Sequence, residues 1–285
     1  MRVAVIQMSP NESKADNIAQ ARGLIEALVA EQKLDLIALP EIWTCLGGTR
    51  AQKFTQAEIL PAPHTNAPLA PGEQGGEAYE FLRGIAMAHN IHVHGGSIGE
   101  LDGDRLYNTA LVFSPAGAEL ARYRKIHLFD ITAPDGQGYR ESATYGAGRE
   151  IVTCMIGETR IGLAICYDLR FPELFLALRR AGAEIIILPA AFTLQTGKDH
   201  WEVLLRARAI ETQCFIAAPA CTGPHREGAS GEVRYTYGHS LIADPWGHVV
   251  AKASDGPGWA VASINKAYMA RLRANMPVLE HRRLT

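Results

Sequence analysis

The sequence of 285 residues has no long apolar run and no excess of charge of one sign. No window approaches the roughly 18 apolar residues of a membrane helix, and the apolar run before Ser9 and Pro10 is too short for a signal-peptide core. The formal net charge is −2, and no basic block favours nucleic-acid binding. We therefore expect a cytoplasmic protein with no membrane or nucleic-acid partner, and a small molecule as its ligand.

Cysteine is scarce and irregularly spaced. The five cysteines form no C-x-x-C pair, which argues against a disulfide framework and against a zinc ribbon. His92 and His94 alternate on a predicted strand and share a face, but no third ligand of matching context follows. We expect reduced thiols and no bound metal.

Short apolar runs recur along the chain and predict a layered α/β fold. At 47% hydrophobic residues, the chain can bury a sizeable core. Helical patterns lie at residues 18–29, with Asn11 or Ser13 as the cap, and at about 198–211. This alternation predicts one domain, residues 1–285, in which helices cover sheets. The predicted strands are residues 3–8, 36–39, 91–94, 110–113, 161–165, 185–188, 215–218, 240–243 and 259–264.

Residues that favour turns separate several of these predicted strands and helices. The segments SPAG at 114–117 and DPWG at 244–247 predict hairpin turns. The stretch 61–76 is rich in Pro, Gly and Ala, and it predicts a surface loop near the site. No repeat or low-complexity tract is present.

Cys166 lies where a predicted buried strand turns abruptly polar, just before a helix that begins near Pro172. Backbone N–H groups at such a junction lower the pKa of a thiol and supply an oxyanion donor. A buried cysteine is also often inert packing, so the local context leaves both interpretations open.

Two charged residues beside apolar ones, Glu41 and Lys125, could also carry chemistry. Glu41 comes directly after LIALP at 36–40, where partial burial suits a carboxylate that takes and returns a proton; alternatively it is a solvated residue that starts a loop. Lys125 lies between aromatic and aliphatic residues, and it either needs an anionic partner or extends to solvent. Spacing alone does not join these residues.

Together, three segments resemble the signature segments of the nitrilase superfamily, the carbon-nitrogen hydrolases, in matching order. They are LPE at 39–41, YRKIHLFD at 123–130 and CYDLRFPEL at 166–174. The resemblance continues through residues 200–214, 237–247 and 277–283, and it looks closest to the amidase branch named for deaminated glutathione. It implies a four-layer α-β-β-α sandwich and a homodimer or larger homo-oligomer formed through helices, with the tail from about residue 265 at the interface.

The resemblance also implies a catalytic triad of Glu41, Lys125 and Cys166, with Glu141 as a second buried carboxylate. The residue types then suggest the chemistry: Cys166 attacks an amide carbonyl, Lys125 and the backbone N–H of Tyr167 hold the oxyanion, and Glu41 shuttles the proton. No metal or organic cofactor is required. A thioester acyl-enzyme is the expected intermediate.

Three further residues resemble substrate-binding positions of related amidases. Arg170 occupies the place that meets a substrate carboxylate, or it forms an ion pair with Asp168 or Glu173. Phe192 and Thr196 resemble pocket residues. The segment EIWTC at 41–45, which carries Trp43, and AlaGly at 147–148 depart from the closest relatives, and the exact amide substrate is therefore open.

Other functions compete with this hypothesis. Omega-amidase activity on 2-oxoglutaramate and hydrolysis of N-carbamoyl amides are rivals within the family, and a catalytically silent binding scaffold is the alternative outside enzymes. His127 or His239 paired with Cys166 would resemble a papain-like protease, but the local cysteine signature is missing. GGSIG at 95–99 is too weak a motif for a dinucleotide site. The loops near Trp43 and residues 225–235 are where the sequence says least about the pocket.

Overall fold

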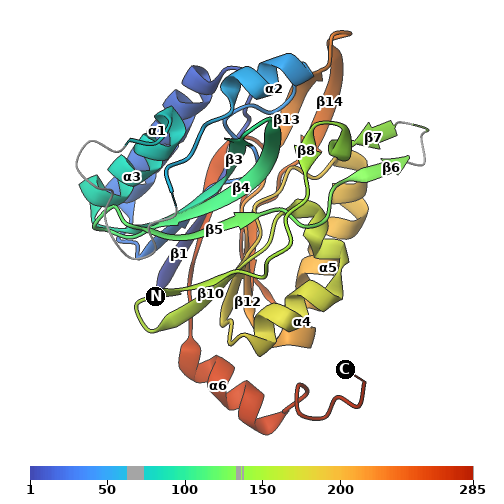
Figure 1. Cartoon of the computed structure of the whole chain (residues 1–285). Helices are drawn as coiled ribbons and strands as arrows, with labels where there is room; N and C mark the ends of the chain where they lie inside the picture. Colours follow the sequence, from blue (N-terminus) through green and yellow to red (C-terminus); the bar gives the residue numbers. More distant parts are fainter. Residues whose placement is uncertain (63–73, 133–135, 137, 285) are drawn as a thin grey trace.

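Two β-sheets packed face to face form the centre of the molecule, and helices cover both outer faces (Figure 1). The computed structural model describes residues 1–62, 74–132, 136 and 138–284. Figure 1 shows α1 and α3 on one outer face and α4 and α5 on the other. The four-layer α-β-β-α sandwich expected from the sequence is confirmed.

The first sheet has the strand order β17-β1-β2-β3-β4-β5, and β8 pairs with β4. Strands β1, β2 and β3 are parallel, so their carboxyl ends meet at one edge. The last strand, β17, closes the sheet antiparallel to β1. The strands are β1 (Arg2–Gln7), β2 (Leu36–Ala38), β3 (His92–Asp102), β4 (Arg105–Phe113), β5 (Glu119–Arg124), β8 (Tyr145–Gly146) and β17 (Gly258–Ser263).

The second sheet has the order β16-β15-β12-β11-β10-β9, with β10, β11 and β12 parallel. Two separate hairpins, β6-β7 and β13-β14, lie outside both sheets. The strands of the second sheet are β9 (Thr153–Ile156), β10 (Thr159–Leu163), β11 (Ile185–Ile187), β12 (Phe215–Ala218), β15 (Leu241–Ala243) and β16 (Val249–Lys252); the hairpins are β6 (Asp130–Thr132), β7 (Gly138–Arg140), β13 (Thr222–Glu227) and β14 (Glu232–Tyr237).

Two helices begin at start signals in the sequence. Ser13 accepts a hydrogen bond from the Asp16 amide at the start of α1, as one of the two expected caps, and Pro172 opens α4. The helices are α1 (Lys14–Glu31), α2 (Arg50–Gln56), α3 (Glu77–His89), α4 (Pro172–Arg180), α5 (Leu194–Thr212) and α6 (Lys266–Asn275), with 3₁₀ turns η1 (Glu141–Ala143) and η2 (Cys166–Arg170).

Alternating side chains of the first sheet lie in two separate hydrophobic cores. Val3 and Val5 face the second sheet, in the core that also holds Ile161 and Ile186. Their neighbours in β1, such as Ala4, face α1 and α3 in a separate core. This period of two is the geometry of a strand with both faces buried, and it explains why the short apolar runs in the sequence mark the strands.

Most predicted elements are present with shifted bounds. All nine expected strands form, and the turns at 114–117 and 244–247 connect β4 to β5 and β15 to β16, each with an i to i+3 backbone hydrogen bond of 2.8 Å. Residues 95–99 lie inside β3 rather than at a nucleotide site. Most of the loop expected at 61–76 lies outside the described residues.

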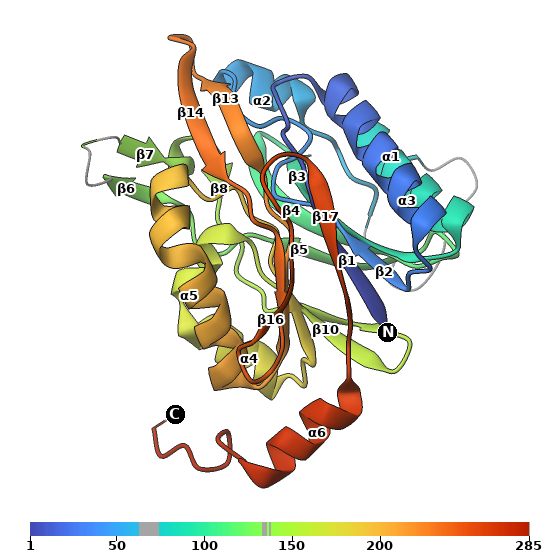
Figure 2. The ribbon, with the colours of Figure 1, turned by 180° about the vertical axis from the view of Figure 1, so that it is seen from behind.

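The C-terminal helix α6 extends beyond the end of the sandwich (Figure 2). It is tied to the second sheet by the Arg273 guanidinium, which donates to the Gln213 carbonyl at 2.8 Å, and by the buried side chains of Met269 and Leu272. Within the described part of the chain, no helix has both the length and the apolar character needed to cross a membrane.

Candidate active site

Glu41 lies just beyond the carboxyl end of β2, in a turn held by a bulge in β3. Gly96 in that bulge has φ +62°, and a Cβ atom there would lie 2.0 Å from the Pro40 carbonyl oxygen. Only glycine allows this close approach. The Ser97 amide donates to the same carbonyl at 3.0 Å, and the Ser97 hydroxyl accepts from the Ile42 amide at 2.9 Å. The bulge therefore fixes the direction of the Glu41 side chain.

Lys125 follows β5 and is almost completely buried, with 1% of the residue exposed. Its Nζ lies 2.8 Å from Glu41 Oε1 and 2.8 Å from Glu141 Oε2. Burial by itself lowers the pKa of Lys125, but the charges of Glu141 and Glu41 outweigh it and raise the pKa well above its usual value. The lysine is therefore a permanent cation between two carboxylates.

Each of the two carboxylates has partners besides the lysine. The second oxygen of Glu41, Oε2, accepts a hydrogen bond from the Ala191 amide at 2.8 Å. Glu141, at the start of η1, accepts from the Phe129 amide at 2.6 Å. Asn108 on β4 donates to Glu41 at 2.9 Å and more weakly to Glu141 at 3.4 Å. The sequence analysis did not identify Asn108, which lies beside Thr109 just before the apolar run at 110–113 and gave no signal of its own.

Cys166 comes from the opposite sheet, three residues beyond β10, where η2 begins. Its amide donates to the Pro189 carbonyl at 2.9 Å, and its φ of +48° is unusual for a non-glycine residue. This conformation turns the chain sharply at the end of the strand. The thiol thereby lies in the same pocket as Glu41 and Lys125.

The thiol is held in its neutral form. Burial raises the pKa of Cys166 well above its usual value, and the charge of Glu41 and a hydrogen bond to Glu41 raise it further, while Lys125 acts in the opposite direction. A neutral thiol is a weak nucleophile and needs a base beside it. Glu41 is in contact with the thiol, and its carboxylate can act as that base.

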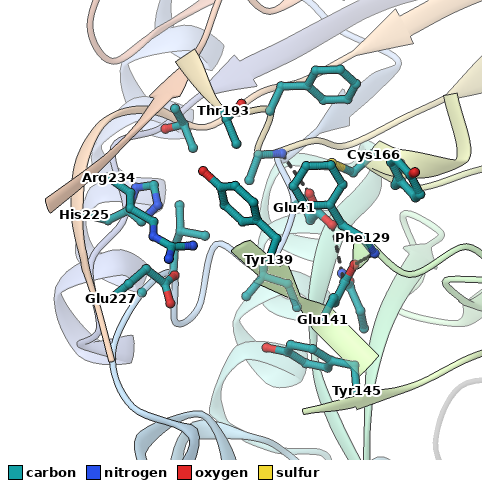
Figure 3. A pocket seen from close by; sticks show the side chains of 18 of the residues that line it. Glu41, Phe129, Tyr139, Glu141, Tyr145, Cys166, Thr193, His225, Glu227 and Arg234 are labelled. Atoms are coloured by element: carbon teal, nitrogen blue, oxygen red, sulfur yellow. Dashed lines mark hydrogen bonds between the residues drawn. The ribbon is translucent and has the colours of Figure 1, made fainter. Parts of the chain in front are cut away.

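These residues line a pocket of about 200 Å³ between the two sheets. Figure 3 shows Cys166, Glu41 and Glu141 together on one side of the pocket, with Phe129 and Tyr139 beside them. The strands of the first sheet position Glu41 and Lys125, and the second sheet positions Cys166. The cluster therefore depends on the packing of the sheets against each other.

The sequence also matches a known protein family. The sequence profile of the carbon-nitrogen hydrolases matches residues 2–274. The chain belongs to the carbon-nitrogen hydrolase family. The resemblance drawn from the three sequence segments is thereby confirmed.

Individual relatives of this carbon-nitrogen hydrolase are similar over nearly their whole length. A deaminated glutathione amidase of Synechocystis sp. is 40% identical over 98% of this chain and 97% of its own. The zebrafish omega-amidase NIT2 is 35% identical over 99% of this chain and 94% of its own. Among solved structures, Saccharomyces cerevisiae Nit3, a member of branch 10 of the nitrilase superfamily, matches with a TM-score of 0.84 and 30% identity over 100% of this chain and 97% of its own.

The residues predicted to bind substrate lie in two places in this carbon-nitrogen hydrolase. Phe192 and Thr196 line the pocket itself, together with Tyr167. Arg170 lies in an adjoining depression that shares Tyr167 and Thr196 with the pocket. Its guanidinium lies 3.4 Å from His200 Nδ1 and faces the Phe192 ring at 5.6 Å.

The ion pair considered for Arg170 does not form. The Asp168 carboxylate is fully buried and is bonded to the Tyr123 hydroxyl at 2.7 Å and to the His127 ring nitrogen at 2.7 Å. Among the described residues, neither Asp168 nor Glu173 pairs with Arg170. The guanidinium therefore remains available to an anion in the depression.

Neither histidine considered as a partner of Cys166 lines the pocket of this carbon-nitrogen hydrolase. His127 is stacked on Phe171 at 3.7 Å, and His239 is stacked on Tyr237 at 4.3 Å. His94 is fully buried, and burial lowers its pKa to about 3. Across residues 1–62, 74–132, 136 and 138–284, no group of three or more His, Cys, Asp or Glu side chains has the arrangement of a metal site.

The segment around Trp43 borders the pocket, as expected, through Glu41, Ile42 and Cys45. The Trp43 ring itself is fully buried on the other side, where it packs on Phe81 and donates to the Gly95 carbonyl at 2.8 Å. A large ring gains more by burial in the core under α3 than at an open pocket.

Proposed function

We propose that this protein is an amidase that hydrolyses a linear carbon–nitrogen bond through a thioester on Cys166. The observation that carries the proposal is the buried cluster in which a neutral thiol contacts a carboxylate, Glu41, that is itself bonded to the Lys125 ammonium at 2.8 Å. A thiol, a base and a fixed cation in one pocket are the groups that acyl transfer needs.

In the acylation step Glu41 acts first as a base and then as an acid. Glu41 takes the proton of Cys166 as the sulfur bonds to the amide carbon. The oxyanion that forms is stabilised by the Lys125 ammonium and the backbone N–H of Tyr167. Glu41 then protonates the nitrogen, the carbon–nitrogen bond breaks, and the acyl group remains on sulfur as a thioester.

Hydrolysis of the thioester reverses these roles. Glu41 takes a proton from water as the water oxygen bonds to the acyl carbon, and it returns the proton to sulfur when the carbon–sulfur bond breaks. The products are a carboxylic acid, an amine and free Cys166. Glu141 holds Lys125 in place through its two contacts of 2.8 and 2.9 Å. All the proton transfers are made by side chains of the chain itself.

The substrate we propose is a small amide that carries a carboxylate on its acyl part, as in deaminated glutathione. Arg170, without an ion pair among the described residues, is a cation in the adjoining depression that such a carboxylate can reach. A planar guanidinium binds a carboxylate with two parallel hydrogen bonds. Phe192 and Thr196 line the wall between Arg170 and Cys166.

A substrate panel tests the proposed function. We expect the purified protein to release the amine of deaminated glutathione with a kcat/KM of at least about 10⁴ M⁻¹s⁻¹, the lower end of typical enzymes, and more efficiently than it releases ammonia from 2-oxoglutaramate or from an N-carbamoyl amide. The measurement is amine or ammonia release at matched concentrations. Absence of turnover with every compound would favour a silent scaffold.

Replacing Arg170 with Gln should weaken substrate binding without changing the chemical step. The carboxylate contact is made in the ground state and in the transition state alike, so we expect KM to rise about 10-fold or more with kcat within about twofold. Initial rates over a range of deaminated glutathione concentrations measure both. Arg180→Gln, an exposed arginine at the end of α4, is the matched control and should leave KM unchanged. An unchanged KM in Arg170→Gln would rule out the substrate contact.

We also propose a single domain that functions as a cytoplasmic homodimer, with the outer face of α5 and the segment from about residue 265 at the interface. Val203 and Ile210 on α5 are 66% and 46% exposed. Large apolar side chains gathered on one outer helix face are typical of a protein interface. Met276, just after α6, is also exposed.

A further inference from the structure

The end of the pocket farthest from Cys166 is built by the β13-β14 hairpin, whose polar sequence suggested only a loop. His225, Glu227 and Arg234 project from it into the pocket, and in Figure 3 Tyr139 lies between them and the side that holds Cys166. The Arg234 guanidinium lies over the Tyr139 ring at 4.5 Å. This group of side chains has no part in the proposed acyl transfer.

Charge at this end of the pocket is predominantly positive. Lys53 pairs with Glu227 at 3.3 Å, so these two charges offset each other. Burial lowers the pKa of His225, which is therefore neutral near pH 7. Arg140 and Arg234 add two more cations to this part of the lining, and the one ion pair of Arg234 among the described residues is a long contact of 3.7 Å with Glu232. The opposite end holds two carboxylates, Glu41 and Glu141, against one lysine, so of the two ends of this pocket the hairpin end is the one that favours an anionic group.

Arg234 has hydrogen-bonding capacity left over. Its contact with Glu232, which is not part of the pocket lining, is 3.7 Å long. Its Nε is buried and has no hydrogen-bond partner within the described part of the chain. Buried polar groups are normally paired, and a guanidinium offers five N–H donors in a planar fork. An unpaired donor that faces a pocket indicates that a bound ligand supplies the hydrogen-bond acceptor.

The hairpin is held rigidly enough to position this arginine. The Gly48 amide donates to the Arg226 carbonyl at 2.6 Å, and the Gly228 amide donates to the Gly48 carbonyl at 3.0 Å. Gly47 has φ +86°, and a Cβ atom there would lie 2.3 Å from the Arg226 carbonyl oxygen, so the two segments are in direct backbone contact. On the other strand of the hairpin, Thr236 forms an isolated antiparallel β-bridge with Thr193. A site fixed in advance loses little entropy on binding.

We propose that Arg234 binds a carboxylate on the leaving amine, and so selects amides whose acyl part and amine part both end in a carboxylate. The inference rests on the proposed function, which puts the acyl carboxylate at Arg170 and therefore directs the amine toward the hairpin. Deaminated glutathione, whose leaving amine is cysteinylglycine, has this form. An amide that releases ammonia leaves the hairpin end empty.

The test compares deaminated glutathione with its analogue in which the glycine carboxylate is a carboxamide. We expect the wild-type protein to favour the carboxylate in kcat/KM by about 10- to 100-fold, the value of a hydrogen bond to a charged group. Arg234→Gln should abolish that preference and leave turnover of 2-oxoglutaramate within about threefold. Arg226→Gln, the same change at an exposed position of the same hairpin outside the pocket lining, should keep the preference.

Two results would overturn the inference: a carboxylate preference that persists in Arg234→Gln, or an equal loss with all three compounds, which would show a structural role. Binding to Cys166→Ala protein, measured by calorimetry with and without Arg234→Gln, separates this inference from the proposed function. If the wild-type protein turns over neither compound, the proposed function fails, and the distal site stands only if binding of the carboxylate form still depends on Arg234.

Discussion

Cys166→Ala should abolish amide turnover and leave the fold intact. In the proposed mechanism the sulfur forms the bond to substrate, and no neighbouring side chain can take its place, so we expect kcat to fall by at least about 10⁴-fold. The side chain is small and occupies an edge of the core, and its loss should cost about 1 kcal/mol. Product release and thermal unfolding measure the two effects separately.

Cys154→Ala is the matched control for this prediction. Cys154 on β9 is also a buried free thiol, and burial raises its pKa to about 12, but it does not line the pocket. The same atom is removed in both variants, and only Cys166→Ala should lose turnover. Near-normal activity of Cys166→Ala would reject the thioester mechanism.

Lys125→Met should reduce both activity and stability. Without the ammonium the oxyanion loses a donor, and we expect kcat/KM to fall by at least about 10²- to 10³-fold. Glu41 and Glu141 would then be two buried carboxylates with no cation between them, which should lower the free energy of unfolding by about 3–5 kcal/mol at neutral pH. Steady-state kinetics and denaturant unfolding test these values.

A second substitution distinguishes charge from packing in this prediction. Adding Glu141→Gln to Lys125→Met removes one of the two unpaired carboxylates, so stability should partly return while activity does not. Lys252→Met, which breaks an exposed pair with Glu202, should change unfolding by less than about 1 kcal/mol. Equal stability of Lys125→Met and the wild-type protein would contradict the buried-cation argument.

Residues close together in the chain account for what the sequence predicted well. The segments before Glu41 and Cys166 are apolar runs that end in a polar residue, and the structure contains a strand in each, β2 and β10. The strand before Lys125, β5, alternates polar and apolar residues and was not among the predicted strands. That the three side chains share one pocket followed from the family resemblance rather than from their spacing. Their proposed catalytic roles stay predictions until the variants are measured.

Contacts between distant segments were beyond sequence reasoning. The β13-β14 hairpin has a polar sequence with glycines at both ends of its turn, and it is held by backbone pairing with Gly48, far away in the chain. Asn108 bonds to Glu41 across 67 positions. The sequence did not show where the Trp43 ring lies, because its partners, Phe81 and Gly95, come from an adjacent helix and strand. Local patterns carry no information on such pairs.

The pairing of β17 with β1 has a consequence for how the protein is made. Among the strands of this fold, β1 is synthesised first, and its partner for six residue pairs, β17, is synthesised last. Until residues 258–263 have been synthesised, one edge of the first sheet stays open and able to pair with other chains. We expect nascent chains to need protection until late in translation, and amide cleavage to begin only once the two ends of the chain have met.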